Sequence, residues 1–171
     1  MQYLIDGHNL IAKIPDIFLE DPNDEAKLVI RLRRWTAAGN KRKISLFFDG
    51  GLPGGQEPYL SSPSVNVIFA TVGTTADELM INRIKRLQNP TEYTLVSSDR
   101  EVKRAAAMRK IQTISASAFA SELIQETGQN FSGRNDSNET EDAKRESRLN
   151  DQEVAEWLEI FDDNNRNQDE T

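Results

Sequence analysis

The chain alternates short apolar runs with segments of helical periodicity, and this alternation limits the fold more than any other feature. Strands are predicted over residues 2–5, 44–48, 65–69, 93–97 and 112–114. These runs are continuously apolar or β-branched, which is typical of parallel strands that are buried on both faces. Strands that alternate with helices predict an α/β fold, with a mainly parallel sheet and helices on both of its faces.

Capping patterns locate the starts of two of the helices. Thr75 followed by Glu78 forms a capping box, so the aspartate between them, Asp77, is expected in a first helical turn. Ser98 followed by Glu101 repeats the pattern and predicts another helix start directly after the fourth strand. Two more helices are predicted, one between residues 24 and 39 and one over residues 116–126.

Charge divides the chain into a body and a tail. Residues 1–127 carry 16 Lys and Arg against 15 Asp and Glu, whereas residues 128–171 carry 5 against 13. We expect one domain over residues 1–127, a disordered acidic linker over 128–150 and a short amphipathic helix over 151–163. That helix is expected to dock on its own body, on a second copy or on another protein. The net charge of −7 therefore belongs to the tail, and the near-neutral body can still attract phosphate.

Composition excludes several kinds of site. The chain has no cysteine and a single histidine, which rules out disulfides, thiolate zinc sites and sites with several histidine ligands. A bound metal ion must then be held by oxygen atoms. No apolar run is long enough to span a membrane and no export signal is visible, so we expect no membrane partner and a cytoplasmic location.

Four aspartates lie at the turning points of the predicted fold. Asp6, Asp49 and Asp99 each follow a predicted strand, and Asp77 begins a helix. The carboxyl ends of parallel strands share one sheet edge, so these side chains are expected to converge, where each close pair would repel by about 4 kcal/mol. A hard divalent cation, Mg²⁺ or Mn²⁺, relieves that repulsion. Phosphoester hydrolysis by in-line attack of an activated water is the chemistry that such a site favours.

Each of these aspartates also has a purely structural interpretation. Asp6 with Asn9 can form a turn, Asp77 and Asp99 can stabilise helix N-termini, and Asp49 can belong to a glycine loop. The occurrence of all four in one α/β pattern favours a site. A phosphatase or phosphoacceptor domain fits less well, because Asp6-Gly7-His8 lacks the second acid that such sites use.

Four motifs in order resemble one family. They are Asp6-Gly7-His8-Asn9, Phe48-Asp49-Gly50 and the segments 73–78 and 97–101. Together they resemble the NYN domain of bacterial YacP-like nucleases, a branch of the PIN-like ribonucleases. The resemblance implies a PIN-like three-layer α/β/α sandwich and a metal-dependent ribonuclease site. The catalytic residues that it implies are Asp6, Asn9, Asp49, Asp77 and Asp99, of which Asp6, Asp77 and Asp99 are the expected metal ligands.

RNA contacts are expected from side chains around the acidic centre. The candidates are His8, Thr74, Thr75, Arg100 and Arg104. The two threonines can bind a phosphate or simply cap the helix, and the two arginines share one face of the helix after Asp99. Many relatives have tyrosine where this chain has His8. A further basic stripe, Lys27, Arg31 and Arg34, is interpreted as a solvated face.

The resemblance also implies endonucleolytic cutting of RNA. Some relatives act on messenger RNA at the ribosome, so messenger RNA and the ribosome are candidate partners here. The alternative is a catalytically weak or inactive RNA-binding adaptor on the same scaffold. The presence of all four aspartates favours the enzyme.

Overall fold

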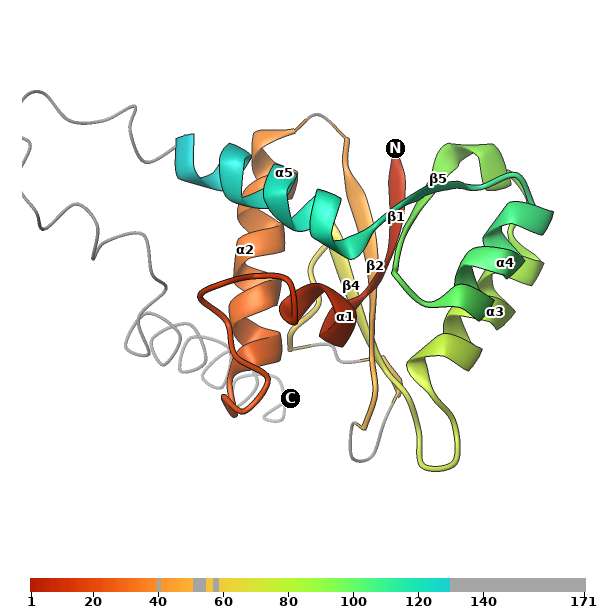
Figure 1. Ribbon diagram of the computed structural model, residues 1–171, viewed down its shortest axis with the longest axis horizontal. Coiled ribbons are helices and arrows are strands. Elements are labelled where there is room, and N and C mark those ends of the chain that lie inside the picture. Colours follow the sequence, from red (N-terminus) through yellow and green to blue (C-terminus); the bar gives the residue numbers. More distant parts are fainter. Residues whose placement is uncertain (40, 51–54, 57–58, 130–171) are drawn as a thin grey trace, which may run out of the picture. The chain divides into compact units, whose positions relative to one another are not determined.

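Six strands form one sheet in the order β3-β4-β2-β1-β5-β6 (Figure 1). The computed structural model describes residues 1–39, 41–50, 55–56 and 59–129. Five of the strands pair in parallel, and only the two-residue β3 pairs antiparallel, with β4. The strands are β1 (Gln2–Asp6), β2 (Lys43–Phe48), β3 (Gly55–Gln56), β4 (Val65–Phe69), β5 (Tyr93–Val96) and β6 (Gln112–Ile114).

Helices cover both faces of this sheet. They are α1 (Gly7–Ile11), α2 (Asp24–Ala38), α3 (Ala76–Arg86), α4 (Arg100–Met108) and α5 (Ala116–Gln129), with a 3₁₀ turn η1 (Pro90–Glu92) before β5. Figure 1 shows α1, α2 and α5 on one side of the strands and α3 and α4 on the other. The predicted three-layer α/β/α sandwich is confirmed.

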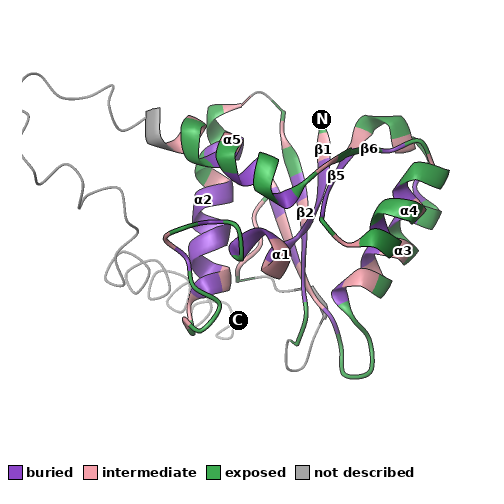
Figure 2. Ribbon diagram, viewed as in Figure 1, coloured by how far each residue is buried: buried purple, intermediate pink, exposed green. Residues whose placement is uncertain are grey.

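Each face has its own apolar core, which explains why the strands are apolar on both sides. The first core joins Ile5 and Leu46 to Leu32 of α2 and Phe119 of α5. The second joins alternate strand residues, such as Leu4, to residues of α3 and α4. The burial colours of Figure 2 follow this pattern, because the strands and the inner sides of the helices are mostly buried. Burial on two faces favours parallel pairing.

The order of the strands creates a switch point in the middle of the sheet. From β1 the chain adds β2 and then β4 on one side, and it then crosses to add β5 and β6 on the other. The crevice between β1 and β5, at their carboxyl ends, is where open α/β folds bind ligands. The sequence predicts all five parallel strands, and the structure confirms them.

Three local features differ from the sequence-based expectations. Asp6 and Asn9 suggested a turn after β1. This segment is instead the short helix α1, which is capped by the carboxylate of Asp6. The N-cap of α4 is Asp99 and not Ser98, since the Asp99 carboxylate accepts hydrogen bonds from the N–H groups of Glu101 and Val102. An aspartate is at least as good a cap as a serine. The strand β3 was not predicted, because two residues carry no periodicity.

The remaining expectations for the chain ends fall partly outside the described residues. The last helix of the body, predicted over residues 116–126, extends to Gln129. The linker from residue 130 onward and the amphipathic helix at 151–163 lie outside the part of the chain that the structure describes. No helix within that part is both long and apolar enough to cross a bilayer.

A close approach between α1 and β2 fixes the start of the first helix. A Cβ atom on Gly7 would lie 2.1 Å from Cε1 of Phe48, whose side chain is fully buried. The ring of Phe48 is held in turn by stacking on Phe69, with ring centroids 5.2 Å apart. Only glycine therefore fits directly after Asp6.

We expect Gly7→Ala to lower the free energy of unfolding by about 1–3 kcal/mol, because the extra methyl group overpacks a rigid core. The loss should be smaller in a Phe48→Leu background, where the smaller side chain leaves room. Urea unfolding of the four proteins measures both quantities. Equal losses in the two backgrounds would show that the contact with Phe48 is not the cause.

Candidate active site

Hydrogen bonds link the carboxyl ends of β1 and β5. The register pairs Ile5 with Val96, which brings Asp6 level with Ser97. The Ser97 hydroxyl, which is buried, donates to Oδ2 of Asp6 at 3.4 Å and accepts from the backbone N–H of Asp99 at 3.0 Å. The serine thus connects the two aspartates across the switch point. The sequence places Ser97 in a motif but does not indicate this connecting role.

The neighbouring strand β2 brings a third aspartate to the same edge. In the register Asp6 pairs with Phe47, and Asp49 follows two residues later. Oδ1 of Asp49 accepts the backbone N–H of Ala76, the first residue of α3, at 2.7 Å. The N-terminus of α3 is therefore fastened to the end of β2, and Asp77 is the next residue. The geometry brings together the elements that carry all four predicted aspartates.

The carboxylates act on one another electrostatically. Burial, followed by repulsion from the charges of Asp99, Asp6 and Asp49, and then from Glu101, raises the pKa of Asp77 to about 6. Burial also raises the pKa of Asp6, and the charge of Asp49 adds to that effect, whereas hydrogen bonds to Asp6 oppose it. This mutual effect is what the sequence predicts for converging acids. Glu101 is a further contributor that the sequence analysis did not identify.

The acids are not packed into a closed chelating cluster. Across the described ranges, no three His, Cys, Asp or Glu side chains stand close enough together to hold a metal ion by themselves. Hydrogen bonds to the protein engage Oδ1 of Asp6, Asp49 and Asp99. Mg²⁺ does not need a closed protein cage, because it usually binds one or two carboxylates and keeps several waters.

Asn9 has a side-chain atom with no partner. Its backbone N–H donates to Oδ1 of Asp6 at 3.1 Å. Its side-chain Oδ1 is buried and accepts no hydrogen bond from any described residue. A buried polar atom without a partner is rare in proteins and suggests a missing ion, water or ligand. Carboxylate and amide oxygens are the kinds of ligand that a hard cation such as Mg²⁺ prefers.

His8 extends the site toward α2. Its Nε2 lies 3.5 Å from Oε1 of Glu25, and its ring centroid lies 5.1 Å from that of Phe48. The hydrogen bond to Glu25 raises the pKa of His8, and the charges of Glu25, Asp24 and Asp49 act in the same direction against burial. The sequence indicates Asp24 and Glu25 only as the start of a predicted helix, and it does not identify them as neighbours of His8.

The two threonines of the site loop are engaged within the protein. The Thr75 hydroxyl accepts the N–H of Glu78 and completes the predicted capping box. The Thr74 hydroxyl donates to the carbonyl oxygen of Thr71 at 3.0 Å. Both residues are exposed. Their predicted contact with RNA stays a prediction.

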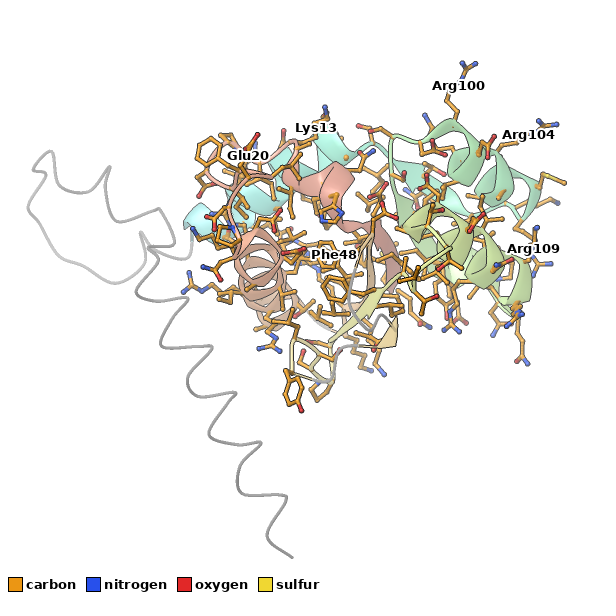
Figure 3. The ribbon with its side chains drawn as sticks, turned by 90° about the horizontal axis from the view of Figure 1, so that it is seen from below. Lys13, Glu20, Phe48, Arg100, Arg104 and Arg109 are labelled. Atoms are coloured by element: carbon orange, nitrogen blue, oxygen red, sulfur yellow. The ribbon has the colours of Figure 1, made fainter. Side chains whose placement is uncertain are left out.

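Arg100 and Arg104 lie on the exposed side of α4. In Figure 3, which looks onto the molecule from below, both side chains project outward from that helix. The other predicted basic stripe is different, because Lys27 and Arg31 are buried, with exposed fractions of 6% and 8%. Their partners are Asp21 and Asp16, at 2.5 Å in each case. The interpretation of that stripe as a solvated face is therefore wrong for these two residues.

Comparison with known proteins agrees with the fold. The family model described as the YacP-like NYN domain matches residues 3–162. The crystal structure of Rae1 (YacP) from Bacillus subtilis has a TM-score of 0.63 and 18% identity, covering 99% of this chain and 92% of that one. A tryptophan-to-leucine variant of Rae1 has a TM-score of 0.61 and 19% identity, covering 94% and 91%. The sequence matches none of the curated proteins.

The charge of Asp77 should make stability depend on pH. The fold disfavours the ionised form of Asp77. Its contribution to the free energy of unfolding is therefore complete below the ordinary pKa of 3.8 and is lost as the pH rises through about 6. In EDTA, we expect Asp77→Asn to be more stable than the wild type at pH 8 by up to about 1 kcal/mol, since solvent screens a half-exposed group.

This gain should shrink as the pH falls from 7 to 4, which thermal unfolding at a series of pH values measures. Glu92→Gln is the matched control, because it removes an exposed carboxylate at the other end of β5. A gain for Asp77→Asn that does not change with pH would contradict the electrostatic explanation.

Proposed function

The chain belongs to the YacP-like NYN domain family, and from this membership we propose that it is a metal-dependent endoribonuclease. Domains of this family are nuclease-like. The observation that carries the proposal is that burial and neighbouring carboxylates raise the pKa of Asp77 and of Asp6 at this edge, where Asn9 also has a buried amide oxygen without a partner. Such an arrangement costs stability, and a divalent cation at this edge would offset that cost.

The proposed metal ligands are Asp6, Asp77 and Asp99, with Mg²⁺ or Mn²⁺ as the ion. When bound, the ion supplies an activated water for in-line attack at phosphorus and neutralises charge on the phosphate oxygens. The hydrogen bonds that fix Asp49 and Asp99 use Oδ1 of each. The carboxylates of Asp49 and Asp99 are therefore held through Oδ1 by backbone N–H groups.

Two side chains, the anionic Asp49 and the neutral Asn9, would orient the reactants. We assign to Asp49, whose Oδ1 accepts the N–H of Ala76 at the start of α3, the orientation of the attacking water. The side chain of Asn9 can both donate and accept hydrogen bonds, so it can contact a substrate phosphate or a water of the ion. Both residues are anchored by backbone contacts, which limits the motion that the reaction would otherwise have to overcome.

An acidic centre repels RNA, so binding requires cations at its rim. Arg100 and Arg104 lie on α4, whose N-cap is the proposed ligand Asp99. One helical turn separates them, and both are exposed. We propose that these two arginines bind RNA phosphates near the cleavage site. His8, Thr74 and Thr75 would contact the nucleotides nearest to that site. Messenger RNA on the ribosome, in the cytoplasm, is the narrower substrate that the family resemblance suggests.

A second candidate function is an RNA-binding adaptor without turnover. One observation favours it, namely that among the described residues no three acidic or histidine side chains are already arranged as a metal centre. The adaptor would bind RNA equally well with and without metal and would not cut it. The enzyme would cut only with metal.

We expect the purified protein to cut labelled RNA with Mn²⁺ and to stop when EDTA is added. Asp6→Asn and Asp99→Asn should each lower the rate by at least about 100-fold, because they remove a charge that holds the ion. Both aspartates are N-caps, and asparagine caps a helix as well as aspartate does. The variants should therefore fold normally.

Gel analysis of the products over time measures the rates, with Glu92→Gln as the control that should cut like the wild type. Circular dichroism establishes that the variants are folded. Cleavage by both asparagine variants at the wild-type rate would refute the assigned site. Metal-independent binding without any cleavage by the wild type would favour the adaptor.

Metal binding should also stabilise the fold. At a free concentration of about 100 times its dissociation constant, the ion should add about 2.7 kcal/mol to the free energy of unfolding. Asp6→Asn should lose most of that gain, because it weakens the site. Unfolding in EDTA and in Mn²⁺ measures the difference for both proteins. An equal gain in the variant would place the ion elsewhere.

A further inference from the structure

The imidazole of His8 is wedged between two elements that are distant in sequence. On one side Nε2 faces Oε1 of Glu25, on the first turn of α2, at 3.5 Å. On the other side the ring lies against Phe48 at the end of β2, with a 60° angle between the ring planes. The side chain of His8 remains 31% exposed. The ring is thus only partly covered by its neighbours.

Glu25 is itself held in place by its neighbour. Asp24, which is only 3% exposed, accepts the backbone N–H of Glu25 on its Oδ1 at 2.7 Å. The hydrogen bond from His8 lowers the pKa of Glu25 to about 2, whereas burial and the nearby charge of Glu25 raise the pKa of Asp24 to about 7. Glu25 is therefore the partner that remains ionised, and it faces the histidine.

The contact between His8 and Glu25 favours folding when both groups are charged, but that gain is small. An ion pair that is about one-quarter to one-third exposed contributes little to folding. The charges of Glu25, Asp24 and Asp49 all act on this one imidazole. Acids gathered around one group repel one another, which lowers the stability of the fold. A gain in binding accounts better for the presence of this contact.

We propose that Glu25 is a positioning residue for RNA binding, which holds the His8 imidazole so that its Nδ1 edge contacts the sugar-phosphate backbone beside the cut. This inference rests on the proposed function. Glu25 engages Nε2, and no hydrogen bond between described residues uses Nδ1. Nδ1 can donate to a phosphate or accept from a 2′-hydroxyl, so the contact forms in either protonation state of the ring.

Backbone contact fits better than stacking on a base. The ring of His8 already packs against an aromatic side chain, that of Phe48, with the ring planes at 60°. Its Nε2 faces Oε1 of Glu25 at 3.5 Å, which favours one rotation of the ring. We therefore assign to the imidazole a contact through its edge and not stacking on a base. The neighbours of the ring that carry charge, Asp24, Glu25 and Asp49, are all acids, so the histidine is the group there that can approach RNA without repulsion.

The test is a double-mutant cycle on RNA binding. Anisotropy of a short fluorescein-labelled single-stranded RNA in EDTA reports binding without cleavage. We expect Glu25→Ala to weaken binding by about 3- to 10-fold, and Glu25→Gln, which keeps the acceptor oxygen, by less. In a His8→Ala background neither change should weaken binding further. Glu20→Ala, which removes an exposed carboxylate from the segment before α2, is the control and should bind like the wild type.

Kinetics in Mn²⁺ add a second readout. Glu25→Ala should raise KM with little change in kcat, because the backbone contact is made equally in the ground state and the transition state. If Glu25→Ala does not fold, the cycle with Glu25→Gln tests the same coupling. An equal loss in the presence and absence of His8, or no loss at all, overturns the inference. Its failure is distinct from that of the nuclease proposal, since the binding measurement needs no turnover.

Discussion

The parallel pairing of β1 with both β2 and β5 is the constraint on which the site depends. This pairing sets the ends of the three strands at one edge, so that Asp6, Asp49 and Ser97 emerge there within two residues of one another in the register. Fully buried strand residues such as Leu4 and Ile5, which contact helices on opposite faces, hold the register. A slip by one residue would move each of them to the wrong face and would also separate the acids.

The fold accommodates the acids by giving each one a structural task. Asp6 and Asp99 cap α1 and α4, and Asp49 receives an N–H from the start of α3. Helix N-termini carry partial positive charge, so these bonds favour the ionised carboxylates. Asp77 makes no cap contact of this kind with any described residue, and burial, followed by the charges of Asp99, Asp6 and Asp49, raises its pKa to about 6. The structural role of these aspartates is therefore compatible with the function proposed for them.

The sequence predicts the fold and the acidic edge well, because both depend on local signals. Apolar runs locate the parallel strands, and the aspartates that follow them locate the edge. What the sequence does not predict depends on tertiary contacts between α1 and α2. The sequence indicates that Lys27 and Arg31 belong to an exposed basic stripe. In the structure, the loop before α2 supplies acidic partners for both residues. Glu25 reads as an ordinary helix start, and only the structure brings it to His8.

The same reasoning explains how one site draws on both helical layers. The layer of α3 and α4 supplies Asp77 and Asp99 together with exposed arginines, whereas the layer of α1 and α2 supplies Asn9, His8 and Glu25. Strands β1 and β2 lie between the layers and contribute the remaining acids. If the proposed nuclease function holds, RNA at this edge would touch both layers, and the rigidity of the sheet would set the distance between the proposed RNA-binding and metal-binding groups. A ligand that spans two layers gains from that rigidity, because the contacts on each side are arranged before it binds.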